Sequence, residues 1–324
     1  MTCRLDLTRR ALTVAALLMA CSCAQAAVLA LTPTASGDAL HVVDVQTLNA
    51  TTQEAASCCA VQTGTVTADP DDHVLFFVAN DSSGPLLYSF SYGSSTTIAS
   101  VPISSGTRIS QMNFDQLREQ LVALVSDDNG GTDIANVDPG TGTVTTIAAL
   151  GPDCCVLRQG VAAYLPLTRT LYAVGRRSTD STDQLLAFDM ADGVLAQNAD
   201  LGTLRVSQLA TDGISLYALV YTPSTDDLTL DQVSTANLGF TQIGNVASGC
   251  CFALTGPATI DVASNSFNAL LRSSDGSNLS TVTSFSLNDG TMTQGNAIQA
   301  MGLFDDTAAL SDRIFADGFE VDTP

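Results

Sequence analysis

The chain has 324 residues, of which 12 are basic and 33 acidic, so its formal net charge is −21 at pH 7. All of the basic residues are Arg, because the sequence contains no Lys. Such a field repels phosphate backbones and anionic lipids, which argues against nucleic acids and anionic membrane surfaces as partners. Acid excess commonly serves solubility, and the alternative is cation capture, because Asp-rich loops supply the oxygen ligands that Ca²⁺ prefers.

Residues 1–26 have the pattern of an export signal. Three Arg residues form a basic start, residues 11–20 are an apolar run, and Ala24-Gln25-Ala26 provides a small-x-small cleavage site. The apolar run is too short to span a bilayer, and no later segment has about 18 consecutive apolar residues. The sequence therefore predicts a secreted or periplasmic protein without a membrane span.

A second interpretation of the N-terminus is a lipoprotein signal. The stretch 18–21 resembles a lipobox, which would leave a lipidated Cys21 as an anchor. Cleavage after Ala26 leaves six cysteines, all in adjacent pairs, whereas lipidation at Cys21 would leave Cys23 as an odd thiol in an oxidising compartment. Cysteine parity thus favours the soluble product.

The rest of the chain has the pattern of an all-β protein. Long amphipathic stretches are missing, while Thr, Val, Ser, Gly and Asp are abundant. Short alternating runs are bounded by turn residues throughout, as in half-buried strands.

Three pairs of adjacent cysteines recur at a fixed interval of 96 residues. They are Cys58-Cys59, Cys154-Cys155 and Cys250-Cys251. A fixed period indicates a repeat architecture. The stretch before each pair has the order strand, polar loop, strand, tight turn, strand, and another copy of the same order follows each pair.

The 96-residue period therefore divides into two units of about 48 residues, each with four short strands, which is the size of a propeller blade. We expect inner strands to begin near residues 60, 107, 156, 203 and 252. A further inner strand near Ile298–Phe304 lacks outer strands of its own, and the stretch 28–57 supplies three strands without an inner one. Joining the two completes a sixth blade and hides the sheet edges.

In this arrangement the chain resembles bacterial secreted six-bladed β-propellers of the broad class related to NHL and YWTD repeats. The resemblance is architectural and covers the mature chain; there is no Trp-Asp dipeptide, because the sequence has no Trp. It implies four-stranded blades, three two-blade repeats of 96 residues, and a last blade closed by the N-terminal strands. The propeller is expected over residues 27–310, and a β-sandwich array fits the strict period less well.

Residues 311–324 form a C-terminal tail in this division. Its stretch from Asp312 to Glu320 is similar to a short ending found on many secreted proteins of certain Gram-negative bacteria. The alternative is a last strand that docks its apolar side chains.

Each cysteine pair comes just before an inner strand, so the three pairs are expected to surround the mouth of the central channel. Bridges between repeats would have to cross a whole blade, and disulfides need Cα atoms within about 7 Å, so we expect a bridge within each pair. The pairs have three interpretations: rigid rings that fix the turns, a flat apolar surface that binds a ligand, or thiolates that bind a soft metal when reduced.

Other candidate residues are fewer. The loop containing Asp127, Asp128 and Asp133 offers several oxygens for Ca²⁺ but lacks the spacing of an EF-hand. The two histidines, His41 and His73, are too few for a zinc site and are expected to be structural.

Arg176-Arg177 is expected to pair with Asp180 or Asp183; the alternative is bidentate binding of a carboxylate.

No catalytic motif is found, so we expect a monomeric binding or interaction protein without a cofactor other than Ca²⁺. Its site is expected at the channel mouth, and the ligand is a small molecule or a protein. The alternatives are a Ca²⁺-assisted hydrolase or lactonase-like enzyme, which six-bladed propellers host, and a purely structural surface protein.

Overall fold

The computed structural model describes most of the chain between residues 27 and 305. The described ranges are 27–34, 37–44, 48–56, 60–81, 84–91, 96–104, 107–126, 132–151, 154–177, 179, 182–248, 251–253, 258–273, 280–298 and 302–305. The expected signal segment 1–26 and the tail 311–324 lie outside them.

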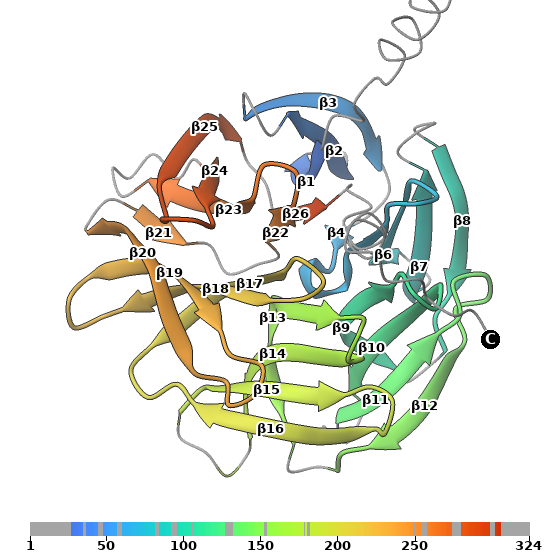
Figure 1. The fold of residues 1–324 in the computed structure, drawn as a ribbon. Coiled ribbons are helices and arrows are strands. Elements are labelled where there is room, and N and C mark those ends of the chain that lie inside the picture. Colours follow the sequence, from blue (N-terminus) through green and yellow to red (C-terminus); the bar gives the residue numbers. More distant parts are fainter. Residues whose placement is uncertain are drawn as a thin grey trace, which may run out of the picture.

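The described strands form antiparallel sheets arranged around a common axis (Figure 1). Five of these sheets are each built from one continuous stretch of chain. The first contains β4 (Ala60–Val61), β5 (Thr67–Asp69), β6 (Val74–Asp81), β7 (Gly84–Ser91) and β8 (Thr96–Pro102). The second contains β9 (Arg108–Asp115), β10 (Gln120–Ser126), β11 (Thr132–Val137) and β12 (Val144–Ala149).

The next three sheets repeat this order. The third contains β13 (Val156–Leu165), β14 (Thr170–Arg176), β15 (Gln184–Asp189) and β16 (Val194–Asp200). The fourth contains β17 (Arg205–Thr211), β18 (Leu216–Thr222), β19 (Asp227–Val233) and β20 (Phe240–Ser248). The fifth contains β21 (Cys251–Ala253), β22 (Thr259–Asp261), β23 (Ser266–Ser273), β24 (Ser280–Ser286) and β25 (Met292–Ile298).

The remaining sheet joins the two ends of the chain. Strand β26 (Gly302–Asp305) pairs antiparallel with β1 (Ala27–Thr34), and β2 (Gly37–Asp44) and β3 (Asn49–Ala56) follow outward. β26 also contacts β22 on one side and β5 on the other. The pairing predicted between the last strand and the N-terminal strands is therefore confirmed.

Inner strands lie near the axis and the last strand of each sheet lies at the circumference (Figure 1). The inner strands begin at Ala60, Arg108, Val156, Arg205 and Cys251, close to the predicted positions. The prediction of four-stranded blades is confirmed, and in the first and fifth sheets the innermost of the four strands is divided. Their inner strand is broken into two pieces, β4 and β5 in one and β21 and β22 in the other.

The core lies between neighbouring sheets. In β10 every side chain from Leu121 to Val125 is at most 3% exposed, because both faces of the sheet are covered. Leu121, Ala123 and Val125 belong to an apolar cluster shared with the first sheet, and Val122 and Leu124 to one shared with the third. Continuous apolar runs are the expected pattern for strands that are buried on both sides.

Turns at the ends of the inner strands are fixed by aspartates. Asp69, Asp212 and Asp261 each end or follow an inner strand, and one carboxylate oxygen accepts the backbone N–H two residues on. Such turns are what Asp favours at this position. His73 lies in the first of these turns, with a left-handed φ of 53°.

Candidate functional site

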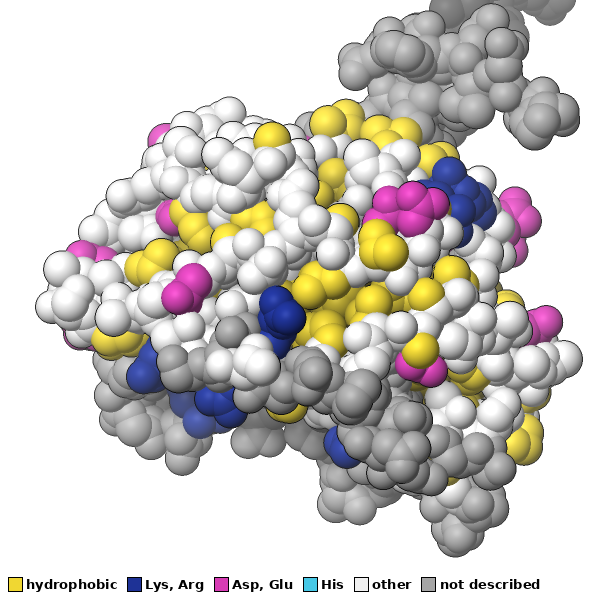
Figure 2. Space-filling model, turned by 90° about the horizontal axis from the view of Figure 1, so that it is seen from below, with side chains coloured by type: hydrophobic (Ala, Val, Ile, Leu, Met, Phe, Trp, Pro, Cys, Tyr) yellow, Lys and Arg dark blue, Asp and Glu magenta, His cyan; other side chains and the backbone are white. Residues whose placement is uncertain are grey.

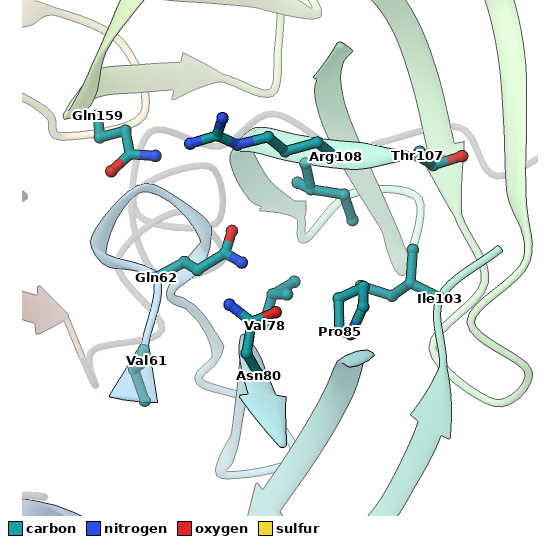
Figure 3. Close-up of a pocket in the computed structure, with 10 residues that line it drawn as sticks. Val61, Gln62, Val78, Asn80, Pro85, Ile103, Thr107, Arg108 and Gln159 are labelled. Carbon is teal, nitrogen blue, oxygen red and sulfur yellow. The ribbon is translucent and has the colours of Figure 1, made fainter. Parts of the chain in front are cut away.

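A pocket of about 510 Å³ opens between the first and second sheets and reaches the third (Figure 3). Its lining consists of Val61, Gln62, Val78, Asn80, Pro85, Ile103, Thr107, Arg108, Ile109 and Gln159. The lining residues come from the first residues of the inner strands β4, β9 and β13, the end of β6, the start of β7 and the segment that follows β8. The pocket therefore opens at the end of the sheets where the inner strands begin.

Gln62 is placed in the pocket by the break in the first inner strand. β4 stops at Val61, and the 3₁₀ turn η1 (Thr63–Thr65) follows before β5 begins. The Gln62 N–H donates to the Val78 carbonyl at 2.9 Å, and the Thr65 hydroxyl donates to the Gln62 carbonyl at 2.8 Å. These bonds fix the main chain while the side chain extends into the pocket (Figure 3).

The side-chain oxygen of Gln62 is buried and has no hydrogen-bond partner within the described part of the chain. A buried acceptor without a donor is costly, so most such atoms in proteins are paired. The oxygen belongs to a side chain that lines the pocket.

Arg108 brings the only charge among the lining residues that the structure describes. It is the first residue of β9, its side chain is exposed, and its guanidinium points across the pocket toward Gln159 and Gln62 (Figure 3). No ion pair joins it to an acidic residue of the described ranges. Arg118, in contrast, pairs with Asp115 at 3.2 Å, and Arg158 pairs with Asp183.

The pairing of Asp183 with Arg158 corrects one alternative for Arg176-Arg177. Sequence proximity suggested Asp183 as a partner of that arginine pair. The inner strand β13 instead carries Arg158 alongside the turn that precedes β15, so the nearer guanidinium comes from another strand. Asp180 lies outside the described residues.

The described cysteine pair, Cys154 and Cys155, forms a disulfide between neighbouring residues. Both residues are 7% exposed and belong to the apolar cluster between the second and third sheets. The Thr132 hydroxyl donates to the Cys155 carbonyl at 3.2 Å. This pair is thus part of the core between sheets, which favours the interpretation that it fixes the turn before β13.

The structure describes only a small part of the other two cysteine pairs. Cys58, Cys59 and Cys250 lie outside the described residues, and Cys251 begins β21 without a described side chain. A ring of three pairs around the channel mouth therefore stays a prediction.

The hypothesis that Asp127, Asp128 and Asp133 bind Ca²⁺ also stays a prediction. Asp127 and Asp128 lie outside the described residues, and Asp133 is a half-buried residue of β11 that pairs with Val125 and Ala149. Within the described ranges, no group of three or more His, Cys, Asp or Glu residues is placed to hold a metal ion.

Two glutamines near the axis bind main-chain groups of the neighbouring sheet. Gln111 and Gln208 are each 1% exposed. The Gln111 amide donates to the Arg158 carbonyl at 2.6 Å, and the Gln208 amide donates to the Leu270 carbonyl at 3.3 Å. They connect neighbouring blades directly.

The perturbed titratable groups lie away from the pocket. The Tyr164 hydroxyl donates to Asp115 at 2.7 Å at the far end of β9, and burial together with this carboxylate raises the pKa of Tyr164. Burial also raises the pKa of Asp231 in β19, whose hydrogen bond to Thr229 acts in the opposite direction. Neither group lines the pocket.

Negative charge is not gathered at one place on the face in Figure 2. The described acidic side chains there are scattered, with hydrophobic side chains exposed between them (Figure 2). Such a distribution fits the solubility role of the acid excess. Among the described residues there is also no helix with the length and apolar character needed to cross a bilayer.

Sequence reasoning missed the pocket residues Gln62, Asn80, Arg108 and Gln159. One signal was available for Arg108, since it is a basic residue at the predicted start of an inner strand in a chain with few basic residues. The amides gave no signal, because Gln and Asn occur throughout the sequence.

No family model and no curated protein matches the chain. Solved structures match it at low identity. A chain of the nidogen–laminin complex is 13% identical with a TM-score of 0.58, and the match covers 87% of this chain and 98% of that one.

Putative TolB from Agrobacterium tumefaciens is 12% identical with a TM-score of 0.55, covering 85% and 90%. A putative 6-phosphogluconolactonase from Bacteroides fragilis is 13% identical with a TM-score of 0.53, covering 87% and 98%. Together with the sheet arrangement, these likenesses show an all-β propeller with four-stranded antiparallel blades.

Proposed function

We propose that this chain is a ligand-binding propeller and that its site is the pocket between the first three inner strands. The observation that carries the proposal is the lining of this pocket, in which Arg108 and three side-chain amides face a space of about 510 Å³ beside an apolar wall. This size and mixture are typical of small-molecule sites. None of the lining residues that the structure describes is an Asp, Glu, His or Cys that would serve acid–base or nucleophilic chemistry, so binding is favoured over hydrolysis there.

A screen of small molecules against the full chain tests this function. Gln159→Trp places a large side chain at an exposed position of the pocket, and Gln197→Trp makes the same change at an exposed position of the outer strand β16. We expect ligands that bind the wild type and the Gln197→Trp variant but bind the Gln159→Trp variant at least tenfold more weakly. Ligands that bind all three proteins equally would contradict the proposed site.

We also propose that the sheets form a ring of six blades built from three two-blade repeats. In support, the inner strand is interrupted in alternate sheets. It is broken between β4 and β5 and between β21 and β22, and in β13 its pairing with β14 is interrupted between Leu157 and Ala162. The intervening sheets carry only a short irregularity near Ser110 and Ser207. The interrupted strands are those that follow a cysteine pair.

Export with removal of residues 1–26 is part of the same proposal, as is a bridge within each cysteine pair. The disulfide between Cys154 and Cys155 supports it, since disulfides persist mainly in oxidising compartments. Peptide mapping of the purified mature protein without reductant, starting with its N-terminal sequence, is the test. A mature N-terminus at Cys21, or bridges that join different pairs, would replace this proposal.

A further inference from the structure

We propose that the pocket takes a hydroxylated carboxylate, of the chemical class of a sugar acid; this inference rests on the proposed function. It follows from one unpaired positive charge, one unpaired buried acceptor, and an apolar wall that lie around the same space.

The carboxylate is selected by Arg108. Among the described lining residues its guanidinium is the one charged group, and no acidic residue of the described ranges neutralises it. Guanidinium groups bind carboxylates through two parallel hydrogen bonds, a geometry that a lysine does not reproduce. The chain as a whole carries a net charge of −21, so an unpaired arginine in a pocket stands out from its surroundings.

The hydroxyl groups are selected by the amides. The buried Gln62 oxygen accepts no hydrogen bond from described residues, and a bare carboxylate has no donor to offer it. A hydroxyl group is both donor and acceptor, so it can donate to Gln62 and accept from Asn80 or Gln159, whose amides line the same space (Figure 3). A ligand with both groups therefore satisfies more of the pocket than a simple fatty acid does.

The apolar residues of the pocket and the negative charge of the chain narrow the class of ligand further. Val78, Pro85 and Ile103 lie together at one side of the pocket, where the C–H face of a sugar ring can pack (Figure 3). Phosphorylated sugars carry up to two negative charges, and the acidic chain repels them more strongly than a monoanion. We therefore favour the carboxylate over the phosphate.

Calorimetric titration of the full chain at low salt tests the inference. The probes are glucuronate, galacturonate and gluconate, with glucose as the neutral match, propionate as the carboxylate without hydroxyls, and glucose 6-phosphate as the phosphate. We expect at least one sugar acid to bind tenfold or more tightly than each of the three comparison compounds. Its affinity should fall as NaCl screens the charge pair.

Two variants assign the contacts. Arg108→Gln should weaken binding of the sugar acid about tenfold or more, while Arg108→Lys should retain part of the affinity because the charge remains. Gln62→Met removes the buried acceptor and should weaken the sugar acid several-fold. Thermal unfolding of each variant shows whether it is folded, and Arg108 is exposed, so its replacement should leave the fold intact.

The outcomes separate the two proposals. If ligands sensitive to Gln159→Trp are found but all are neutral, are phosphates, or ignore Arg108→Gln, the sugar-acid inference is wrong and the binding function stands. If no sugar acid binds, the inference is also wrong. If no compound of the screen is sensitive to Gln159→Trp, the pocket itself is rejected.

Discussion

Asp115 lies at the end of β9 and has no solvent exposure. Two donor groups stabilise its buried side chain. The Tyr164 hydroxyl donates to it at 2.7 Å from the neighbouring sheet, and the Arg118 guanidinium lies at 3.2 Å. Because the pKa of Tyr164 is raised by burial and by Asp115, its hydroxyl stays protonated and remains a donor over the physiological pH range.

Tyr164→Phe should therefore destabilise the protein by about 1–3 kcal/mol, because a buried charged acceptor loses one donor. The matched control is Tyr221→Phe, which removes a similar bond to Asp226 at the surface, where water replaces the lost donor. Denaturant unfolding measures both changes. Equal losses in the two variants would show that the buried contact has no special weight.

Asp231 is a second residue whose burial affects the stability of the folded protein. It is 7% exposed, and its Oδ1 has no partner within the described chain. Burial raises its pKa above the ordinary value of 3.8. A carboxyl with a raised pKa in the folded state favours folding only while it is protonated, so its contribution is lost as the pH rises through the folded-state pKa.

Asp231→Asn should accordingly raise the melting temperature at pH 7, and the gain should shrink as the pH falls toward 3.8, where the wild-type carboxyl is protonated. Asp192→Asn at an exposed turn makes the same change in net charge and serves as the control. Melting curves across this pH range provide the measurement. A gain that is the same in both variants would point to net charge instead of burial.

At the scale of the element, the short turn η1 shows how the first inner strand accommodates its neighbours. η1 contacts both β9 and β13. A Cβ placed on Gly64 would lie 2.3 Å from the Ser110 carbonyl oxygen and 3.1 Å from the Gly160 nitrogen, so only glycine fits between these backbones. The same turn positions Gln62 for the pocket.

Gly64→Ala should thus cost about 1–3 kcal/mol of stability and weaken ligand binding together, because the backbone of η1 must shift. Gly140→Ala is the control, since a Cβ there meets only the Asp138 carboxylate, at 3.4 Å. Unfolding curves and titrations of both variants report the two effects. Stability loss without any change in binding would separate η1 from the site.

At the scale of the whole molecule, the two chain ends are joined by the pairing of β26 with β1. Register pairs run from Val28 with Asp305 to Leu31 with Gly302. Without β26, the edge of β1 would be free to pair with another chain.

A chain that ends at Met301 should lose about 4 kcal/mol of stability, at roughly 1 kcal/mol for each lost backbone hydrogen bond, and it should aggregate. A chain that ends at Leu310 retains β26 and is the control. Thermal unfolding and light scattering compare the two. If the shorter chain is as stable and monodisperse as the control, the pairing of the chain ends does not hold the ring together.

Much of the architecture could be predicted because strand-like stretches follow one another in a regular order along the sequence. The predicted starts of the inner strands lie close to those of β4, β9, β13, β17 and β21, and the chain ends pair as expected. The turns could not be predicted as well. His73, Glu119, Arg169 and Asn265 share the same left-handed conformation just before a second strand, and four different residue types give no common signal.

The candidate pocket and the site predicted from the sequence consist of different residues. The site predicted at a channel mouth ringed by cysteine pairs stays a prediction. The residues of the pocket were not expected, because the buried oxygen of Gln62 and the approach of Gln159 to Arg108 depend on where a broken strand in one sheet meets two others. The described cysteine pair faces the core for the same reason, since the packing of neighbouring sheets decides which side of a turn is covered.

By itself, the sequence determined that this protein is built from a succession of short strands whose first and last members pair. Strand length and the alternation of apolar and polar residues can be read from the chain without knowing its contacts. Only the tertiary structure decided which polar groups remain without partners. That outcome depends on distances between blades, and residues from different blades come close only after the ring has formed.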